Sequence, residues 1–115
     1  MRGLGTMHEL AITQSIVDIV SEKALSRQVI RVKLAIGKLS AIEPDAVQFC
    51  FDVCTKGTYA EGAALEIDHI EGLGRCKNCA TEIPLTQSSW RCQCGSNDIE
   101  CIAGQELTIT ELEVV

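Results

Sequence analysis

The spacing of apolar residues changes from a helical to an extended period within the first third of the chain. Between positions 10 and 25, apolar side chains recur every three or four residues, which predicts an amphipathic helix. The residues on its apolar face are Ile12, Ile16, Ile19, Val20 and Ala24. Positions 29 to 36 instead alternate between apolar and other residues, which predicts a half-buried strand that ends at Gly37. The residues expected on the buried face of this strand are Ile30, Val32, Leu34 and Ile36.

Both patterns recur further along the chain. Pro44 stands where a first helical turn tolerates proline, and apolar residues follow at helical spacing, so a second helix is predicted over residues 44–56. Two more strands are predicted over residues 64–70 and 106–114. Because a lone two-stranded sheet is marginally stable, we expect the last strand to pair with the first sheet. The predicted fold class is therefore α+β, with two helices on a three-stranded sheet.

Four of the seven cysteines form two close pairs, Cys76-x-x-Cys79 and Cys92-x-Cys94, ahead of the last predicted strand. Two cysteines across a tight turn direct both sulfurs into one space, and four thiolates suit tetrahedral zinc. Four protein ligands leave no open position for water, which predicts a structural site rather than a catalytic one. A segment this small cannot bury enough surface to fold unaided, so the ion is expected to supply folding energy.

The second pair departs from the usual zinc ribbon, because one residue separates its cysteines instead of two. The tighter turn is expected to weaken the backbone N–H bonds that support each sulfur, and Cys101 is an alternative ligand. Cys50 and Cys54 lie one turn apart on the apolar face of the second predicted helix. Buried cysteine packs as a small hydrophobe, so we interpret both as core residues, with a second metal or redox pair as the alternative.

Composition and charge narrow the function. Of the 115 residues, 46% are hydrophobic but only 3% aromatic, so aliphatic side chains must fill the core. The formal net charge of −6 argues against binding nucleic acid, because a phosphate backbone needs clustered Lys and Arg. No apolar stretch approaches the roughly 18 residues of a membrane span, and no secretory signal is visible. Paired cysteines then indicate metal ligands in a reducing cytoplasm, and a Cys76–Cys79 disulfide is the alternative.

The cysteine-rich stretch interrupts the predicted sheet domain. We expect one domain formed by residues 7–71 and 104–115, with a zinc-binding domain of residues 72–103 inserted into it. Gly72 and Gly74 are interpreted as the hinge between the two. Residues 1–6 lie ahead of a second methionine, Met7, at which the helical pattern begins, and they are interpreted as a leader.

Met7, His8 and Glu9 are predicted at the head of the first helix. Taken generically, they form a helix entry with an acidic residue that is favourable near the positive helix end. If translation begins at Met7, however, a free α-amine, deprotonated backbone nitrogens and an imidazole surround one ion in a plane. Square-planar nitrogen ligation favours Ni²⁺ or Cu²⁺.

Several short segments together resemble the HypA/HybF family of hydrogenase nickel-incorporation (maturation) proteins. The resemblance extends over nearly everything from Met7 to the end of the chain, and the combination is far more specific than any single segment. The matching segments are Met7-His8-Glu9-Leu10, Ile36-Gly37-Lys38-Leu39, Ile42-Glu43-Pro44, Cys76-x-x-Cys79, Trp90-Arg91-Cys92, Cys94-Gly95-Ser96 and Gly104-Gln105-Glu106-Leu107.

This resemblance implies a nickel metallochaperone that binds Ni²⁺ and delivers it for maturation of [NiFe]-hydrogenase. It implies a nickel domain joined to a zinc ribbon, with a HypB-type GTPase and the hydrogenase large subunit as partners. Nickel is then held by the Met7 amine, His8 and the Glu9 amide, while the zinc ligands are Cys76, Cys79, Cys92 and Cys94. With residues 1–6 present, the Met7 amine is an amide, so we expect the nickel cage to be incomplete. Urease is a further possible recipient of the nickel.

Two other function classes use the same cysteines. One is a zinc-ribbon module that binds nucleic acid or protein, which the negative charge opposes for nucleic acid. The other is a redox or iron–sulfur protein, which would be coloured. Neither a Ser/His/Asp arrangement nor a phosphate-binding glycine loop is visible, so no enzyme activity is expected. The oligomeric state is left open between a monomer and a homodimer that exchanges its last strand.

Overall fold

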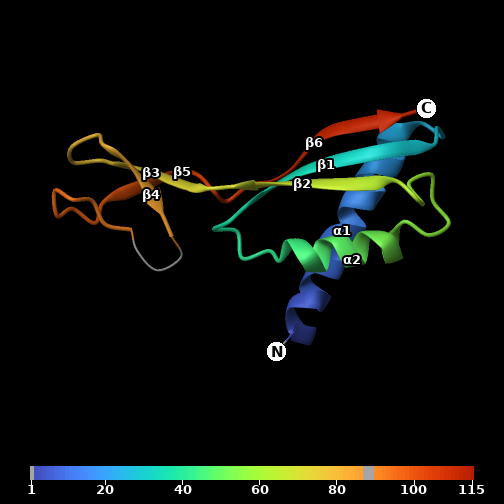
Figure 1. The fold of residues 1–115 in the computed structure, drawn as a ribbon, viewed down its shortest axis with the longest axis horizontal. Helices are drawn as coiled ribbons and strands as arrows, with labels where there is room; N and C mark the ends of the chain where they lie inside the picture. The colour runs from blue at the N-terminus through green and yellow to red at the C-terminus, as the bar shows by residue number, and fades with distance from the viewer. Residues whose placement is uncertain (1, 87–89) are drawn as a thin grey trace. The chain divides into compact units, whose positions relative to one another are not determined.

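The computed structural model describes residues 2–86 and 90–115 of the chain. The elements in chain order are α1 (Arg2–Ala24), β1 (Val29–Gly37), α2 (Pro44–Cys54), β2 (Ala64–Ile70), β3 (Gly72–Cys76), β4 (Glu82–Leu85), β5 (Ile99–Ala103) and β6 (Leu107–Val114) (Figure 1). They form two three-stranded sheets, with strand orders β2-β1-β6 and β4-β3-β5. Within the described residues, no helix is both long and apolar enough to cross a membrane.

The chain divides into two compact units. The helical unit comprises Met1–Leu34, Ile42–Asp68 and Thr108–Val115, and the cysteine unit comprises Ala35–Ala41 and His69–Leu107. In the helical unit, α1 and α2 pack against each other on one face of the β2-β1-β6 sheet (Figure 1). The predicted α+β class is thus confirmed, including the return of the last strand to the first sheet and the insertion of a separate module before it.

The core of the helical unit is aliphatic, as the low aromatic content requires. Its largest buried side chain is Phe51 on α2, which is 1% exposed. The other buried apolar residues of this unit are Ile16, Val17, Val20, Ala24, Val29, Val32, Leu34, Val47, Cys50 and Ala60. Two residues predicted on buried faces are exposed instead, namely Ile19 at 43% and Ile30 at 44%. The buried stripe of α1 runs through Thr13 and Val17, so the helix is rotated relative to the prediction.

The first helix begins earlier than predicted. The expected start near Leu10, with Met7 to Glu9 at the helix head, is wrong, because α1 begins at Arg2 and includes these residues. Residues 2–6 contain no proline, and extending an existing helix adds one hydrogen bond for each residue fixed. At the other end, Leu25 and Ser26 adopt left-handed φ angles of 54° and 65°, which terminates the helix at Ala24.

The open face of the first sheet carries a charge network centred on β1. Arg31 contacts three carboxylates on the neighbouring strands, at 3.1 Å from Glu66, 2.8 Å from Glu111 and 3.2 Å from Glu113. The hydrogen bonds with Glu111 and Glu113 raise the pKa of the Arg31 guanidinium, and the Arg31 hydrogen bond lowers the pKa of Glu111. One side chain on the central strand therefore connects both edge strands.

Gly72 and Gly74 do not form the predicted hinge. Both lie in β3, which pairs antiparallel with β4 and β5. A Cβ atom on Gly72 would lie 2.5 Å from the carbonyl oxygen of Leu85, and one on Gly74 would lie 2.7 Å from Cγ2 of Ile99. Glycine is required here because neighbouring atoms leave no room for a side chain.

A second close approach involves Gly104, between β5 and β6. Its φ of +113° is a conformation that favours glycine, and a Cβ atom there would lie 2.6 Å from the Cα of Gly72. A Cβ atom on Gly37 would in turn lie 2.0 Å from the Gly104 carbonyl oxygen. Backbone hydrogen bonds from Leu39 to Gly104 (2.7 Å) and from Gly37 to Glu106 (2.8 Å) fix these segments within the cysteine unit.

Candidate metal centre

The first cysteine pair lies at the end of β3 and in the turn directly after it. The N–H of Cys76 donates to the carbonyl of Thr81 (2.9 Å), and the N–H of Ala80 donates to the carbonyl of Cys76 (2.8 Å). Ala80 has a left-handed φ of 65°, which closes the turn. This geometry brings the sulfur of Cys79 back toward that of Cys76, as expected for two ligands across a tight turn.

The second pair is held by a similar turn. The N–H of Cys92 donates to the carbonyl of Ser96 (3.0 Å), and the N–H of Gly95 donates to the carbonyl of Cys92 (2.9 Å). Gly95, directly after Cys94, has a φ of 95°, which suits glycine. The one-residue spacing is therefore accommodated by a turn of four residues with glycine at the strained position.

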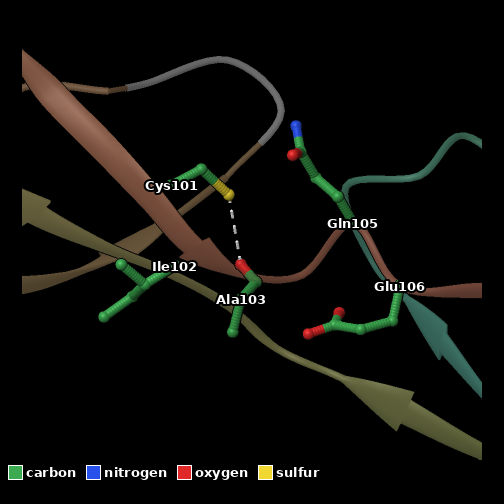
Figure 2. Close-up of a pocket in the computed structure, with 5 residues that line it drawn as sticks. All are labelled: Cys101, Ile102, Ala103, Gln105 and Glu106. Atoms are coloured by element: carbon green, nitrogen blue, oxygen red, sulfur yellow. Dashed lines mark hydrogen bonds between the residues drawn. The ribbon is translucent and has the colours of Figure 1, made fainter.

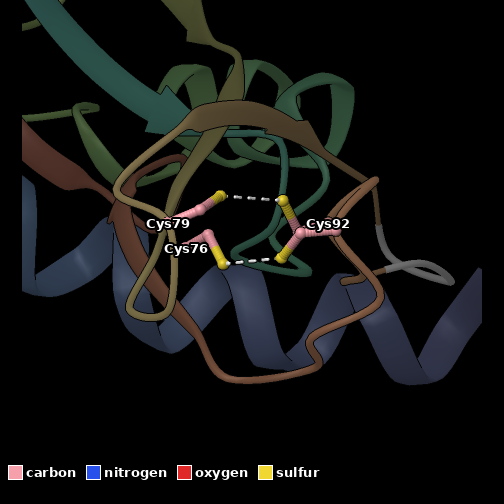
Figure 3. Close-up of side chains that lie close together, drawn as sticks. Cys76, Cys79 and Cys92 are labelled. Carbon is pink, nitrogen blue, oxygen red and sulfur yellow. Dashed lines mark hydrogen bonds between the residues drawn. The ribbon is translucent and has the colours of Figure 1, made fainter.

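The two turns bring four sulfurs together. The four-cysteine cluster consists of Cys76, Cys79, Cys92 and Cys94, and its ligand atoms all lie within 4.8 Å of one another. The sulfurs of Cys79 and Cys92 are 3.5 Å apart, and those of Cys76 and Cys94 are 3.6 Å apart. Zinc–sulfur bonds of about 2.3 Å in a tetrahedron imply sulfur–sulfur distances of about 3.8 Å. Figure 3 shows Cys76, Cys79 and Cys92 directing their sulfurs into one space, so the donor set and its spacing fit zinc.

Backbone N–H groups support the sulfurs despite the short spacing of the second pair. The pKa of Cys79 is lowered to about 6, first by its hydrogen bond with the Thr81 side chain and then by the Thr81 backbone N–H. The pKa of Cys94 is lowered chiefly by the backbone N–H of Ser96. For Cys92, the Cys94 backbone N–H acts in the lowering direction, but burial and hydrogen bonds with the other thiols outweigh it and raise the pKa to about 12. Backbone N–H groups therefore still reach Cys92 and Cys94 at the shorter spacing.

The other three cysteines lie outside the cluster. Cys101 on β5 donates a hydrogen bond to the carbonyl of Ala103 (3.3 Å) and lines a hollow of about 260 Å³ together with Gln105 and Glu106 (Figure 2). The structure thus brings Cys94, and not Cys101, to the four-cysteine cluster. Cys50 is buried in the core, and burial is the main cause that raises the pKa values of both Cys50 and Cys54. This supports their interpretation as packing residues.

The predicted nickel residues occupy consecutive positions within α1. His8 is exposed and Glu9 is only 2% exposed. Neighbouring residues on a helix point in different directions, so these two side chains do not converge on one point. In a regular helix that begins at Arg2, the N–H groups of residues 7–9 lie where intrahelical hydrogen bonds form. Planar coordination by backbone nitrogens in this segment therefore requires the helix to open ahead of Glu9.

Sequence reasoning missed the contact that the Glu9 side chain makes. Its carboxylate Oε2 accepts a hydrogen bond from the backbone N–H of Glu43 at 2.7 Å. The only signal in the sequence is that Glu9 falls on the apolar face of the predicted helix. A glutamate is commonly exposed, so this position alone does not indicate a buried hydrogen bond. The partner lies 34 residues away and contributes a backbone atom, so no side-chain pattern indicates it.

The fold and the site together define a class: small α+β proteins that carry an inserted four-thiolate metal module. Comparison with known sequences then identifies the family. Residues 7–114 match the family model described as HypA, hydrogenase/urease nickel incorporation, metallochaperone. Since this match extends over most of the chain, the protein belongs to the HypA family, and the resemblance drawn from its sequence motifs is confirmed.

Individual relatives agree with this assignment. The chain is 60% identical over 109 residues to a protein of Trichodesmium erythraeum, an alignment that includes 94% of this chain and 96% of the relative. It is 58% identical over 108 residues to a protein of Nostoc sp., with the same two shares. Both relatives are called hydrogenase maturation factor HypA, as is a protein of Geobacter sulfurreducens that is 48% identical over 109 residues and covered to 99%.

Two solved structures share the fold at low sequence identity. The solution structure of a HypA protein superposes with a TM-score of 0.72 at 23% identity, over 95% of this chain and 97% of that one. The solution structure of the Ni metallochaperone HypA from Helicobacter pylori gives a TM-score of 0.67 at 22% identity, over 93% and 97% of the two chains. At these identities the likeness supports the fold alone.

Proposed function

We propose that this protein is a nickel metallochaperone that binds Ni²⁺ and delivers it for maturation of [NiFe]-hydrogenase. The observation that carries the proposal is the family match over residues 7–114, which includes both the Met7-His8-Glu9 segment and the four-cysteine cluster. On this proposal the protein transfers a metal ion and catalyses no reaction. Its proposed place of action is the cytoplasm.

The four-cysteine cluster is proposed to hold a structural Zn²⁺. When bound, the ion supplies folding energy and, with four protein ligands, leaves no position for a substrate. The protein's own residues prepare the site: Cys76 ends a paired strand, and the pKa values of Cys79 and Cys94 are lowered toward the thiolate form that binds metal. The corresponding domains are residues 72–103 for zinc, and residues 7–71 with 104–115 for nickel.

Nickel is proposed as the cargo, held by the α-amine of Met7, by His8 and by the backbone nitrogen of Glu9. Support comes from the exposure of His8, which leaves its imidazole accessible to an ion and to a receiving protein. Nitrogen donors at an accessible site also suit transfer, because an incoming ligand can attach before the original ligands leave. Residues 1–6 are interpreted as a leader. Because they convert the Met7 amine into an amide, the nickel site is proposed to be incomplete while they are attached.

The proposed partners are a HypB-type GTPase and the hydrogenase large subunit, with no role for nucleic acid or membrane. The net charge of −6 supports the exclusion of nucleic acid, because clustered cationic side chains are needed for a phosphate backbone. The protein is proposed to act as a monomer or as a homodimer that exchanges β6.

The decisive experiment compares the full chain with a chain that begins at Met7. Each is purified, analysed for bound metals, and titrated with Ni²⁺ by isothermal calorimetry. We expect one zinc per chain in both proteins. The chain that begins at Met7 should bind nickel at least about tenfold more tightly, because the full chain lacks the free Met7 amine as a ligand. His8→Ala in the shorter chain serves as the control that removes the imidazole. Equal nickel affinities for the two chains would remove the terminal amine from the site, and iron in place of zinc would contradict the structural role of the cluster.

A further inference from the structure

The first turn of α2 has no cap of its own. Its N-cap residue, Glu43, is extended and makes no side-chain capping hydrogen bond. The helix then starts with Pro44, and its first intrahelical hydrogen bond runs from the N–H of Val47 to the Glu43 carbonyl at 3.1 Å. In a capping box, a Glu or Gln three residues after the N-cap accepts the N-cap N–H, but this position is Ala46, which has no acceptor.

The missing acceptor is supplied by α1. The carboxylate of Glu9 accepts the N–H of Glu43 at 2.7 Å, which is the length of a charge-assisted hydrogen bond. The positive end of the α2 dipole further favours a carboxylate at this place. Glu9 therefore completes, from another helix, the half of the capping box that the α2 sequence lacks.

The hydrogen bond to Glu43 is made by a Glu9 side chain that is buried. It is 2% exposed, and its second oxygen, Oε1, is buried without a hydrogen-bond partner among the described residues. Thr13, one turn further along the same face, is also fully buried, and its hydroxyl has no partner among the described residues either. A buried carboxylate is costly unless it is well bonded, so the bond to Glu43 is what compensates for burying Glu9.

We propose that the Glu9 carboxylate is a positioning residue, which anchors the segment that binds nickel to the N-terminus of α2. This inference rests on the proposed function and deepens it: in that proposal the backbone nitrogen of Glu9 binds the ion once the helix opens ahead of it, while the Glu9 side chain holds this residue against a second helix. The carboxylate is therefore not a nickel ligand. Binding of nickel by this segment and the order of the first turn of α2 are linked through the hydrogen bond between Glu9 and Glu43.

The first test uses the full chain without nickel. Amide hydrogen exchange followed by NMR reports the protection of the Glu43 N–H. We expect Glu9→Ala to lower this protection at least about tenfold, as for loss of a hydrogen bond to a charged group. Glu9→Gln keeps an oxygen acceptor at the same chain length and is expected to stay within about threefold of the wild type. Thr13→Ala is the matched control, because it truncates a buried side chain on the same face whose hydroxyl makes no hydrogen bond with the described residues.

The second test measures nickel affinity in whichever of the two chains binds nickel more tightly. Groups that orient a metal ligand typically change affinity by about 10–100-fold when removed, so we expect Glu9→Ala to weaken nickel binding at least about tenfold. Glu9→Gln is expected to restore most of the affinity, and Thr13→Ala to leave it within about threefold of the wild type. The absorption spectrum of bound Ni²⁺ should be unchanged in Glu9→Gln, since no ligand is altered.

The outcomes separate this inference from the proposed function. If neither wild-type chain binds nickel, the proposed function fails, while the exchange of the Glu43 N–H still tests the cap. If the wild type binds nickel and Glu9→Ala binds it equally well, the positioning role is wrong and the proposed function stands. A weakening by Thr13→Ala as large as that by Glu9→Ala would show a general loss of stability and would also overturn the positioning role.

Discussion

The helical unit and the cysteine unit differ in the number and kind of their buried side chains. The helical unit packs two helices on a sheet around aliphatic side chains and Phe51, whereas the buried apolar residues of the cysteine unit are few and include the ligand positions Cys76 and Cys92. In the cysteine unit, close packing comes from glycines whose neighbours leave no space for a Cβ atom. We therefore expect the first unit to fold by burial of its own core, and the second to depend on an ion held by its cysteines.

Removal of zinc should have the largest effect, and this effect should be confined to the cysteine unit. We expect Cys76→Ser, or a strong chelator, to unfold the cysteine unit, because binding of structural zinc contributes on the order of 10 kcal/mol. The helical unit should retain its structure, since its buried residues lie outside the cluster. NMR spectra would show dispersed signals for α1 and α2 and collapsed signals for β3 to β5.

The control for zinc removal is Cys101→Ser. Cys101 lies outside the four-cysteine cluster, so this variant should keep its zinc and its spectrum. Loss of zinc from Cys101→Ser would contradict the assignment of ligands, and simultaneous loss of all helical signals on chelation would contradict the independence of the two units.

Truncation of the aliphatic core should destabilise the helical unit and leave the zinc site intact. Phe51→Ala removes the largest buried side chain of the helical unit and is expected to cost about 3–5 kcal/mol. Urea unfolding followed by far-UV circular dichroism would measure this loss as a lower midpoint. The zinc content should stay at one ion per chain, because the ligands are carried by the other unit. The exposed neighbour Phe49, which is 63% exposed, provides the control, and Phe49→Ala should change the midpoint little.

The smallest expected effect on stability comes from the charge network on β1. It belongs to the helical unit and is recognised by its dependence on pH. Arg31 lowers the pKa of Glu111, so the pair stabilises the folded state above the usual carboxyl pKa of about 4.3. That stability is lost as the pH falls through the lowered pKa of the folded state. We expect Arg31→Met to lower the melting temperature slightly near neutral pH, since exposed pairs contribute little, and the difference from wild type to vanish in acid. A difference that persists in acid would indicate lost packing instead.

The two units also differ in how far their folds can be predicted from sequence. In the helical unit, α2 and the strands β1, β2 and β6 follow from periodicity. The helix α2 has buried residues at helical spacing, and β2 and β6 carry half-buried apolar residues between exposed ones. The start of α1 is not predicted, because residues 1–6 lie ahead of the regular apolar spacing that marks the helix. The exposure of Ile19 is not predicted either, because its face is adjacent to the true buried stripe.

In the cysteine unit, periodicity fails. The strands β3 and β4 are five and four residues long, and β3 contains two glycines, so they show no alternation of apolar side chains. The cysteine spacing nevertheless predicts which four sulfurs come together, because ligand geometry depends on local turns. The contact between Glu9 and Glu43 is beyond prediction, since it joins a side chain to a backbone group in a distant segment.

Cys50 is buried and Cys54 is half-buried, which has a practical consequence for labelling chemistry. Burial raises the pKa of both thiols, and alkylating reagents attack the thiolate. Cys79 is exposed, so in the apoprotein it should react with a maleimide dye at neutral pH faster than the two thiols of α2. A bound ion would protect Cys79 from the dye. Labelling of the wild-type protein would therefore report the loss of zinc as a gain in fluorescence.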